Sequence, residues 1–332
     1  MKKLLLSLIL IPAFGISQNI YNYGFNTPTA SLATDGWSRT NQSTPATTTL
    51  WSVANFPAST TVSATTPAPP FQSQSYTTGQ VAPAPLGQDG TANNFAFVNF
   101  TSTGVISSTG VASGTGTISN WLISPSINVI DGDVISFWTR KGAPSNAAAT
   151  SDFPDRLEMR MAPTASATTP TSGSGDIGGF TTLAKSVNPT LVGGFVYPKV
   201  WTQFSYTVTG YPTSTAVKFA FRYFVTNGGN DGANSDIIGI DTFSVDRTPL
   251  KSNEFFKNSF SVAPNPMIDV VNISKNSNIE ITSASITDIK GRIVKEVNND
   301  VSSINVADLN AGVYFLKVTT PDGSGTTKLI KN

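Results

Sequence analysis

Apolar and polar residues alternate along several short segments of the chain. In residues 156–161, Leu157, Met159 and Met161 occupy every second position. A β-strand points successive side chains to opposite faces, so this pattern predicts a strand with one buried face. Residues 217–225 alternate in the same way. Further strands are predicted at residues 95–100, 135–140 and 204–208.

No segment between residues 19 and 247 keeps a helical period for a dozen residues, and turn-forming Gly, Pro, Ser and Thr recur throughout. This pattern predicts an all-β fold in which sheet packs on sheet, a β-sandwich or jelly roll. Residues 57–90 and 162–179 carry little apolar surface, and we expect long loops there. After a linker at residues 251–259, short strand patterns resume, which predicts a small separate all-β domain at residues 260–332.

The amino terminus has the pattern of a secretory signal peptide. Lys2 and Lys3 precede an apolar run over residues 4–14, and small residues follow up to Ser17. The run is shorter than the roughly 20 residues that span a bilayer. We therefore expect residues 1–17 to be removed, leaving Gln18 first, with no transmembrane segment in the mature protein. No cysteine follows the run, which excludes a lipoprotein anchor.

Composition narrows the chemistry that the chain can perform. The 332 residues contain 39% hydrophobic and 12% charged residues, and the formal net charge of +1 gives no field that attracts nucleic acid. There is no cysteine and no histidine. This excludes disulfides, thiolate nucleophiles, imidazole-dependent triads and zinc sites built on these ligands. Oxygen ligands remain, and these favour calcium or magnesium.

Four motifs occur in order at the carboxy terminus: FSVAPNP at 260–266, DIKGRIV at 288–294, LNAGVYFLKV at 309–318 and KLIK at 328–331. Together they resemble the type A sorting domain of the type IX secretion system. The resemblance implies an Ig-like β-sandwich that is read by an outer-membrane translocon and removed by a sortase-like peptidase. The product would be released or attached to lipopolysaccharide on the outer cell surface. The motif positions taken as the sorting signal are Pro264, Asn265, Pro266, Gly291, Gly312, Tyr314, Lys328 and Lys331.

The central region, residues 18–250, contains Trp-Leu-Ile-Ser-Pro at 121–125, an aromatic first strand followed by Gly36-Trp37, and Ile-Gly-Ile-Asp at 238–241. These residues resemble the choice-of-anchor J or cleaved-adhesin family. The resemblance implies a jelly roll related to MAM domains and carbohydrate-binding modules. The chain departs from the family at Asn26, where relatives often have Glu, and at Thr242, where many have a second Asp. These departures weaken a metal site carried over from the family.

Asp241 is the first candidate site residue, because it lies among apolar residues of a predicted strand. An unpaired carboxylate is costly to bury, so Asp241 needs a partner. One interpretation is a calcium ion shared with the amide oxygen of Asn26. The other is that Asp241 caps a backbone turn or pairs with Arg222. The sequence leaves both open.

Three further features give hypotheses about possible sites. The loop at residues 227–236 is rich in Asn, Asp and Gly and lacks the spacing of an EF-hand, so a solvated turn is favoured. Of the five tryptophans, Trp121 and Trp138 are expected in the core, and Trp51 is the one expected to be exposed for ligand stacking. Asp155 and Glu158 are three positions apart on a strand and point to opposite faces, so they do not form a glycosidase pair.

These features favour a secreted or surface-attached, non-enzymatic binding or adhesion protein whose ligand is a glycan or a surface protein. The alternatives are a hydrolase that uses carboxylates alone and a passive component of the surface matrix.

Overall fold

The computed structural model describes residues 18–62, 71, 78–107, 112–142, 152–247, 256–257, 259–276, 279–298, 301–321 and 323–332. The predicted signal peptide, residues 1–17, lies outside the described residues. The chain divides into two compact units, Asn19–Asp246 and Arg247–Asn332 together with Met1–Gln18. Among the described residues, no helix has both the length and the apolarity needed to cross a bilayer.

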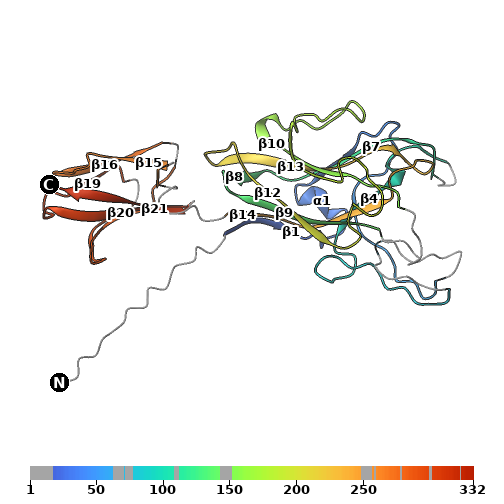
Figure 1. Cartoon of the computed structure of the whole chain (residues 1–332), viewed down its shortest axis with the longest axis horizontal. Helices are drawn as coiled ribbons and strands as arrows, with labels where there is room; N and C mark the ends of the chain where they lie inside the picture. The colour runs from blue at the N-terminus through green and yellow to red at the C-terminus, as the bar shows by residue number, and fades with distance from the viewer. Residues whose placement is uncertain are drawn as a thin grey trace, which may run out of the picture. The chain divides into compact units, whose positions relative to one another are not determined.

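The first unit is built from two six-stranded sheets (Figure 1). The first sheet has the order β12 (Thr202–Thr207), β9 (Val134–Lys141), β14 (Ile237–Arg247), β4 (Ala96–Asn99) and β3 (Ser52–Val53), and β1 (Gln18–Tyr23) also pairs with β14. The second has the order β11 (Thr182–Val187), β10 (Leu157–Pro163), β13 (Thr215–Gly228), β7 (Gly116–Ile123) and β2 (Ser38–Asn41), and β8 (Ile127–Val129) also pairs with β13. Pairing along both orders is antiparallel.

Small elements lie between these strands. A short helix α1 (Ser31–Thr34), two 3-10 turns η1 (Phe100–Ser102) and η2 (Thr164–Ser166), and a two-stranded ribbon of β5 (Val105–Ile106) and β6 (Ala112–Ser113) complete the unit. The described parts of residues 57–90 contain turns and isolated bridges, including Ser59 with Ala82, and no named strand.

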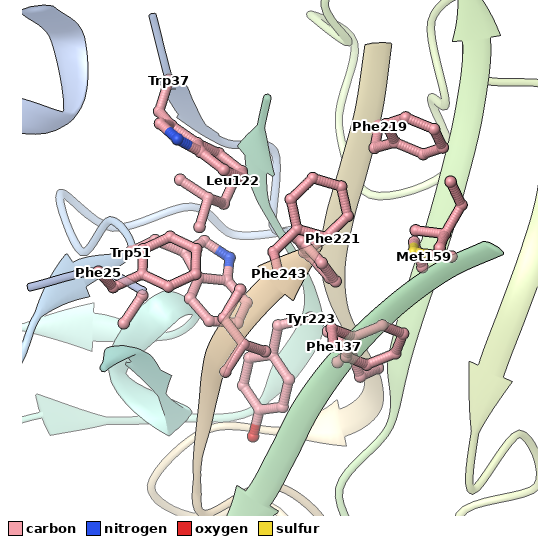
Figure 2. Packing of buried hydrophobic residues seen from close by; sticks show 14 of the residues in the cluster. Phe25, Trp37, Trp51, Leu122, Phe137, Met159, Phe219, Phe221, Tyr223 and Phe243 are labelled. Atoms are coloured by element: carbon pink, nitrogen blue, oxygen red, sulfur yellow. The ribbon is translucent and has the colours of Figure 1, made fainter. Parts of the chain in front are cut away.

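The core of the sandwich lies between the two sheets and is dominated by aromatic side chains (Figure 2). The alternation read from the sequence is confirmed. Leu157, Met159 and Met161 on β10 are completely buried, as are all five apolar side chains at alternate positions from Val217 to Val225 on β13. Phe243 contacts both Phe219 and Phe221 with ring centroids 5.6 and 5.5 Å apart, which ties β14 to the opposite sheet. The all-β sandwich prediction is therefore confirmed.

The second unit also consists of two sheets. One has the order β15 (Phe260–Ala263), β16 (Val270–Lys275) and β19 (Ser303–Asn305), and the other has β18 (Ile293–Asn298), β17 (Ser283–Asp288), β20 (Gly312–Thr320) and β21 (Gly323–Lys331). Their apolar faces form a separate core. Phe256, which the sequence places in the linker, is only 4% exposed and packs in this core, where its backbone also lies against Gly325. The aromatic ring explains why this linker residue is held by the second unit.

Candidate functional site

A cavity of about 220 Å³ lies in the first unit beside the connection between β13 and β14. Three separate segments form it: the start of η1, the segment before β10 and the β13–β14 connection. The lining residues are Phe100, Phe153, Gly229, Asn230, Gly232, Ser235 and Asp236. The cavity therefore combines two aromatic rings with a side-chain amide, a hydroxyl and one carboxylate.

Asp236 supplies the carboxylate of the cavity. Its backbone N–H donates to Asp155 Oδ1 at 2.9 Å, and its carbonyl accepts the N–H of Phe100 at 2.7 Å, so both neighbouring segments hold its main chain in place. Within the described part of the chain, its carboxylate receives no hydrogen bond. A partly buried carboxylate without a donor is unusual in a protein, because polar groups removed from water normally find a partner. No described residue therefore competes with a ligand donor for this carboxylate.

A buried charge network lies behind Asp236. Lys141 is 1% exposed, and its Nζ lies 2.5 Å from Asp152 Oδ1, 2.9 Å from Asp155 Oδ2 and 2.8 Å from the carbonyl of Phe153. Tyr223 donates its hydroxyl to Asp155 Oδ1 at 2.5 Å. The network joins β9 and β13 to the segment that carries Phe153. It fixes the wall of the cavity and occupies the ammonium group of Lys141.

Burial and neighbouring charge change the titration of this group. Burial raises the pKa of Asp236 to about 7, with a further rise from the negative charge of Asp155. Burial by itself would lower the pKa of Lys141, but the charges of Asp155 and Asp152 outweigh it and leave that pKa raised. Burial and the adjacent Asp155 hold the pKa of Tyr223 well above its usual range. Asp236 therefore changes charge near neutral pH, while Lys141 stays protonated and Tyr223 stays neutral.

The sequence only partly anticipated this site. The solvated turn expected at residues 227–236 describes Asp231, which is exposed and accepts the N–H of Gly114 at 2.6 Å. It does not describe Asp236, which the fold turns toward the buried network. Phe100, Phe153 and Lys141 were missed, because no local pattern connects their three segments.

The prediction that Trp51 is exposed for ligand stacking is wrong. Its side chain is completely buried, and its indole N–H donates to the carbonyl of Asn120 at 3.1 Å. Trp51 packs in the core with Trp37 and Phe25 (Figure 2). Trp51 directly precedes β3, which pairs with β4 in the first sheet. Trp121 is buried as expected, whereas Trp138 is only partly buried.

Asp241 obtains its partners from the backbone. The N–H groups of Gln88 and Thr242 each donate to its carboxylate at 2.6 Å, and the register of β14 against β9 shifts directly after it. The suggested pairing with Arg222 is wrong, because Arg222 binds Glu158 instead. Burial raises the pKa of Asp241 to about 6 despite the two N–H donors.

The calcium interpretation of Asn26 and Asp241 stays a prediction. Asn26 is exposed, whereas Asp241 is 2% exposed. The described residues contain no group of three or more acidic side chains arranged to hold a metal ion. Because Gln88 and Thr242 already supply donors, the burial of Asp241 is explained without a cation.

Asp155 and Glu158 belong to two different networks. Asp155 pairs with Lys141, whereas Glu158 on the outer face of the second sheet accepts from Arg156, from Arg160 at 2.7 Å and from Arg222 at 3.1 Å. Burial would raise the pKa of Glu158, but Arg160 and the other two guanidinium groups leave it lowered. Both carboxylates are therefore engaged by the protein's own cations.

In the second unit, hydrogen bonds join the first carboxy-terminal motif to the last motif, which lies on β21. The side-chain oxygen of Asn265 accepts the N–H of Ile330 at 2.9 Å, and its amide donates to the carbonyl of Lys328 at 3.0 Å. The side-chain amide of Asn265, which lies between Pro264 and Pro266 in the sequence, thus forms with β21 the pair of hydrogen bonds that the backbone of an adjacent strand would otherwise form. The first and last motifs are joined by these two hydrogen bonds.

The middle motifs shape a turn and a strand of the same unit. Gly291 has a φ of +82° in the turn between β17 and β18, a conformation that favours glycine. Tyr314 is 8% exposed and donates its hydroxyl to the carbonyl of Asn310 at 2.8 Å, next to the start of β20 at Gly312. Lys328 is exposed and Lys331 partly so. Among the eight positions taken as the sorting signal, these two lysines are the charged residues.

Comparison with known proteins assigns the second unit. Residues 261–332 match the family described as the secretion system C-terminal sorting domain. A comparison with curated proteins found no match.

Several solved structures are similar to the chain. They include the K1 cleaved adhesin domain of Lys-gingipain from Porphyromonas gingivalis W83, with 14% identity and a TM-score of 0.35 over 68% of this chain and 96% of that one. The adhesin domain of Epf from Streptococcus pyogenes has 9% identity and a TM-score of 0.34 over 95% of this chain and 97% of that one. The glycoside hydrolase domain of Endo-D from Streptococcus pneumoniae R6 has 13% identity and a TM-score of 0.26 over 73% and 34%. Scores below 0.5 assign no function.

The family match and the four motifs agree on the same residues, and the motif side chains fasten the strands of one folded unit. The carboxy-terminal unit is a type IX secretion sorting domain, and the protein that carries it is secreted or displayed on the cell surface.

Proposed function

We propose that the two-sheet unit is a non-enzymatic binding or adhesion module that the type IX pathway delivers to the cell exterior. Its ligand is a glycan or a surface protein, and the cavity at Asp236 is the contact site. The translocon and a sortase-like peptidase are the partners of residues 260–332, and they act before the module reaches its ligand.

The observation that carries this proposal is the free carboxylate in a cavity with aromatic walls. Ligand sites are typically concave, mostly apolar and equipped with few polar groups that orient the ligand. Phe100 and Phe153 supply the apolar walls, and Asp236 and Asn230 supply the polar groups. The main chain of Asp236 is fixed on both sides, so little ordering is needed when a ligand binds.

A carboxylate-dependent hydrolase is the second candidate, because a pKa of about 7 at Asp236 suits a general acid. The usual mechanism needs a second carboxylate that faces the same bond. Asp155 is the nearest candidate, but its oxygens are engaged by Lys141, Tyr223 and the N–H of Asp236. Incubation with polysaccharides and peptides tests this candidate, and turnover that Asp236→Asn abolishes would establish it.

The binding proposal is tested with the mature protein on a glycan array and on a panel of cell-surface proteins. We expect binding that Asp236→Asn weakens and Asp89→Asn retains. The two variants remove the same charge, but Asp89 is exposed and does not line the cavity. Absence of binding to every glycan and protein would instead favour the passive matrix component.

A further inference from the structure

We propose that the cavity receives the cationic end of a lysine or arginine side chain presented by a protein ligand. This inference rests on the proposed function, since it specifies the ligand of the same cavity. It follows from the charge, the hydrogen-bond donors and the size of the site.

The charge around the cavity is negative. Asp152, Asp155 and Asp236 lie around Lys141, so these four described residues carry a net charge of −2 (three carboxylates and one ammonium) when Asp236 is ionised. Asp152 and Asp155 are 4% and 0% exposed, and water therefore screens them poorly. A positive group beside Asp236 lowers this excess of negative charge, whereas an anionic ligand would increase it.

No donor of the described residues forms a hydrogen bond with the carboxylate of Asp236. Lys141 directs its ammonium group to Asp152, Asp155 and the carbonyl of Phe153, and Tyr223 donates to Asp155. None of these donors reaches the carboxylate of Asp236. An ammonium or guanidinium group brings several N–H donors, and charge-assisted bonds to a carboxylate are the stronger class of hydrogen bond.

The remaining walls suit the same group. The amide of Asn230 donates to Asp231 Oδ1 at 3.0 Å, which leaves its oxygen as a second acceptor. Phe100 and Phe153 offer ring surface, and a cation over an aromatic face is attracted by the ring. Phe153 is 47% exposed, so this ring is accessible from solvent.

The size of the cavity limits the ligand. Its volume of about 220 Å³ is smaller than the roughly 300–1,000 Å³ of sites that enclose drug-sized ligands. The end of one side chain fits such a volume, whereas a whole oligosaccharide cannot be enclosed in it. This favours a protein ligand over a glycan.

The inference requires that affinity increase with pH. Asp236 must be ionised to bind a cation, and its pKa is about 7 because of burial and Asp155. The other titratable groups that face it are Asp152, Asp155, Lys141 and Tyr223. For a group with this pKa, the ionised fraction, and with it the affinity, rises roughly 90-fold from pH 5 to pH 8.

The experiment titrates the mature protein with n-butylammonium, n-propylguanidinium and the neutral n-pentanol, using calorimetry or ligand-observed NMR at pH 5 and pH 8. We expect both cations to bind at pH 8, to bind more weakly at pH 5, and to bind better than the alcohol. Asp236→Asn should weaken cation binding roughly 10- to 100-fold, as expected for loss of a charged hydrogen bond. Asp89→Asn, which removes an exposed carboxylate outside the cavity lining, should bind as the unsubstituted protein does.

A second variant, Phe153→Ala, removes an exposed ring and leaves the charge network intact, so it tests the site even if Asp236→Asn folds poorly. Weaker cation binding in both variants supports the inference. Equal binding of the alcohol and the cations, or cation binding that neither variant changes, overturns it. If no small cation binds while Asp236→Asn abolishes binding on the glycan or protein panel, the inference is wrong and the proposed function stands. If both kinds of binding are absent, both are wrong.

Discussion

Replacing Lys141 with methionine should destabilise the two-sheet unit strongly. The substitution keeps most of the apolar stem and removes the ammonium group, which is 1% exposed and contacts Asp152, Asp155 and the carbonyl of Phe153. Two buried carboxylates then lose their cation. Removing one partner from a buried ion pair costs about 3–5 kcal/mol, because the remaining charge is left without compensation.

The pH dependence follows from the direction of the pKa shift. Folding raises the pKa of Lys141, so the contribution of its ion pairs is fully present below the ordinary lysine value and is lost only as pH rises through the folded value. The full penalty of Lys141→Met is therefore expected at pH 7.

Urea unfolding followed by tryptophan fluorescence measures this effect in the mature protein. All five tryptophans lie before residue 247, so the signal reports on the two-sheet unit alone. With a slope of about 3 kcal/mol per molar urea, the midpoint should fall by roughly 1–2 M. The control is Lys199→Met, whose exposed ammonium lies 3.9 Å from the ring of Phe195 and which should cost about 1 kcal/mol or less. Equal midpoints for the two variants would refute the reasoning.

Five further predictions concern the same chain. Folding raises the pKa of Asp236 to about 7, so the free energy of unfolding should fall as pH rises from 4 to 7. In the same urea assay, Asp236→Asn should flatten this pH dependence and stabilise the two-sheet unit by about 2–4 kcal/mol at pH 8. Trp51→Phe should cost about 1–3 kcal/mol from a lost buried hydrogen bond and leave ligand binding unchanged on the glycan and protein panel. Truncation of residues 309–332 removes β20 and β21 and should hold the protein in the periplasm with a folded sandwich. Intact-mass measurement of the exported full-length protein should show a chain that begins at Gln18 and ends between about residues 252 and 260. If the predicted calcium site exists, the melting temperature should be higher in calcium than in chelator, and Asp241→Asn should abolish that difference. Identical transitions in the two conditions would leave the backbone N–H groups of Gln88 and Thr242 as the partners of the Asp241 carboxylate.

The sequence by itself determined which strand faces are buried and that the protein carries a secretion sorting domain. Alternation along β10 and β13 placed the core side chains correctly, since the period of two depends only on the local geometry of an extended chain. The sorting domain could also be recognised from the sequence, because its four motifs occur in order near the carboxy terminus. The contacts of Asn265 with Lys328 and Ile330 explain why the first and last motifs go together.

Only the tertiary structure decided the environment of individual polar and aromatic side chains. Trp51 is buried because its indole N–H meets a carbonyl 69 positions away, at Asn120. Asp236 lies on the cavity because its backbone is held by Asp155, 81 positions earlier, which itself depends on Lys141 from another strand. Neighbouring residues are uninformative about such partners. The pairing and packing of distant strands determines them, and with them the burial and charge that distinguish a binding site from a solvated turn.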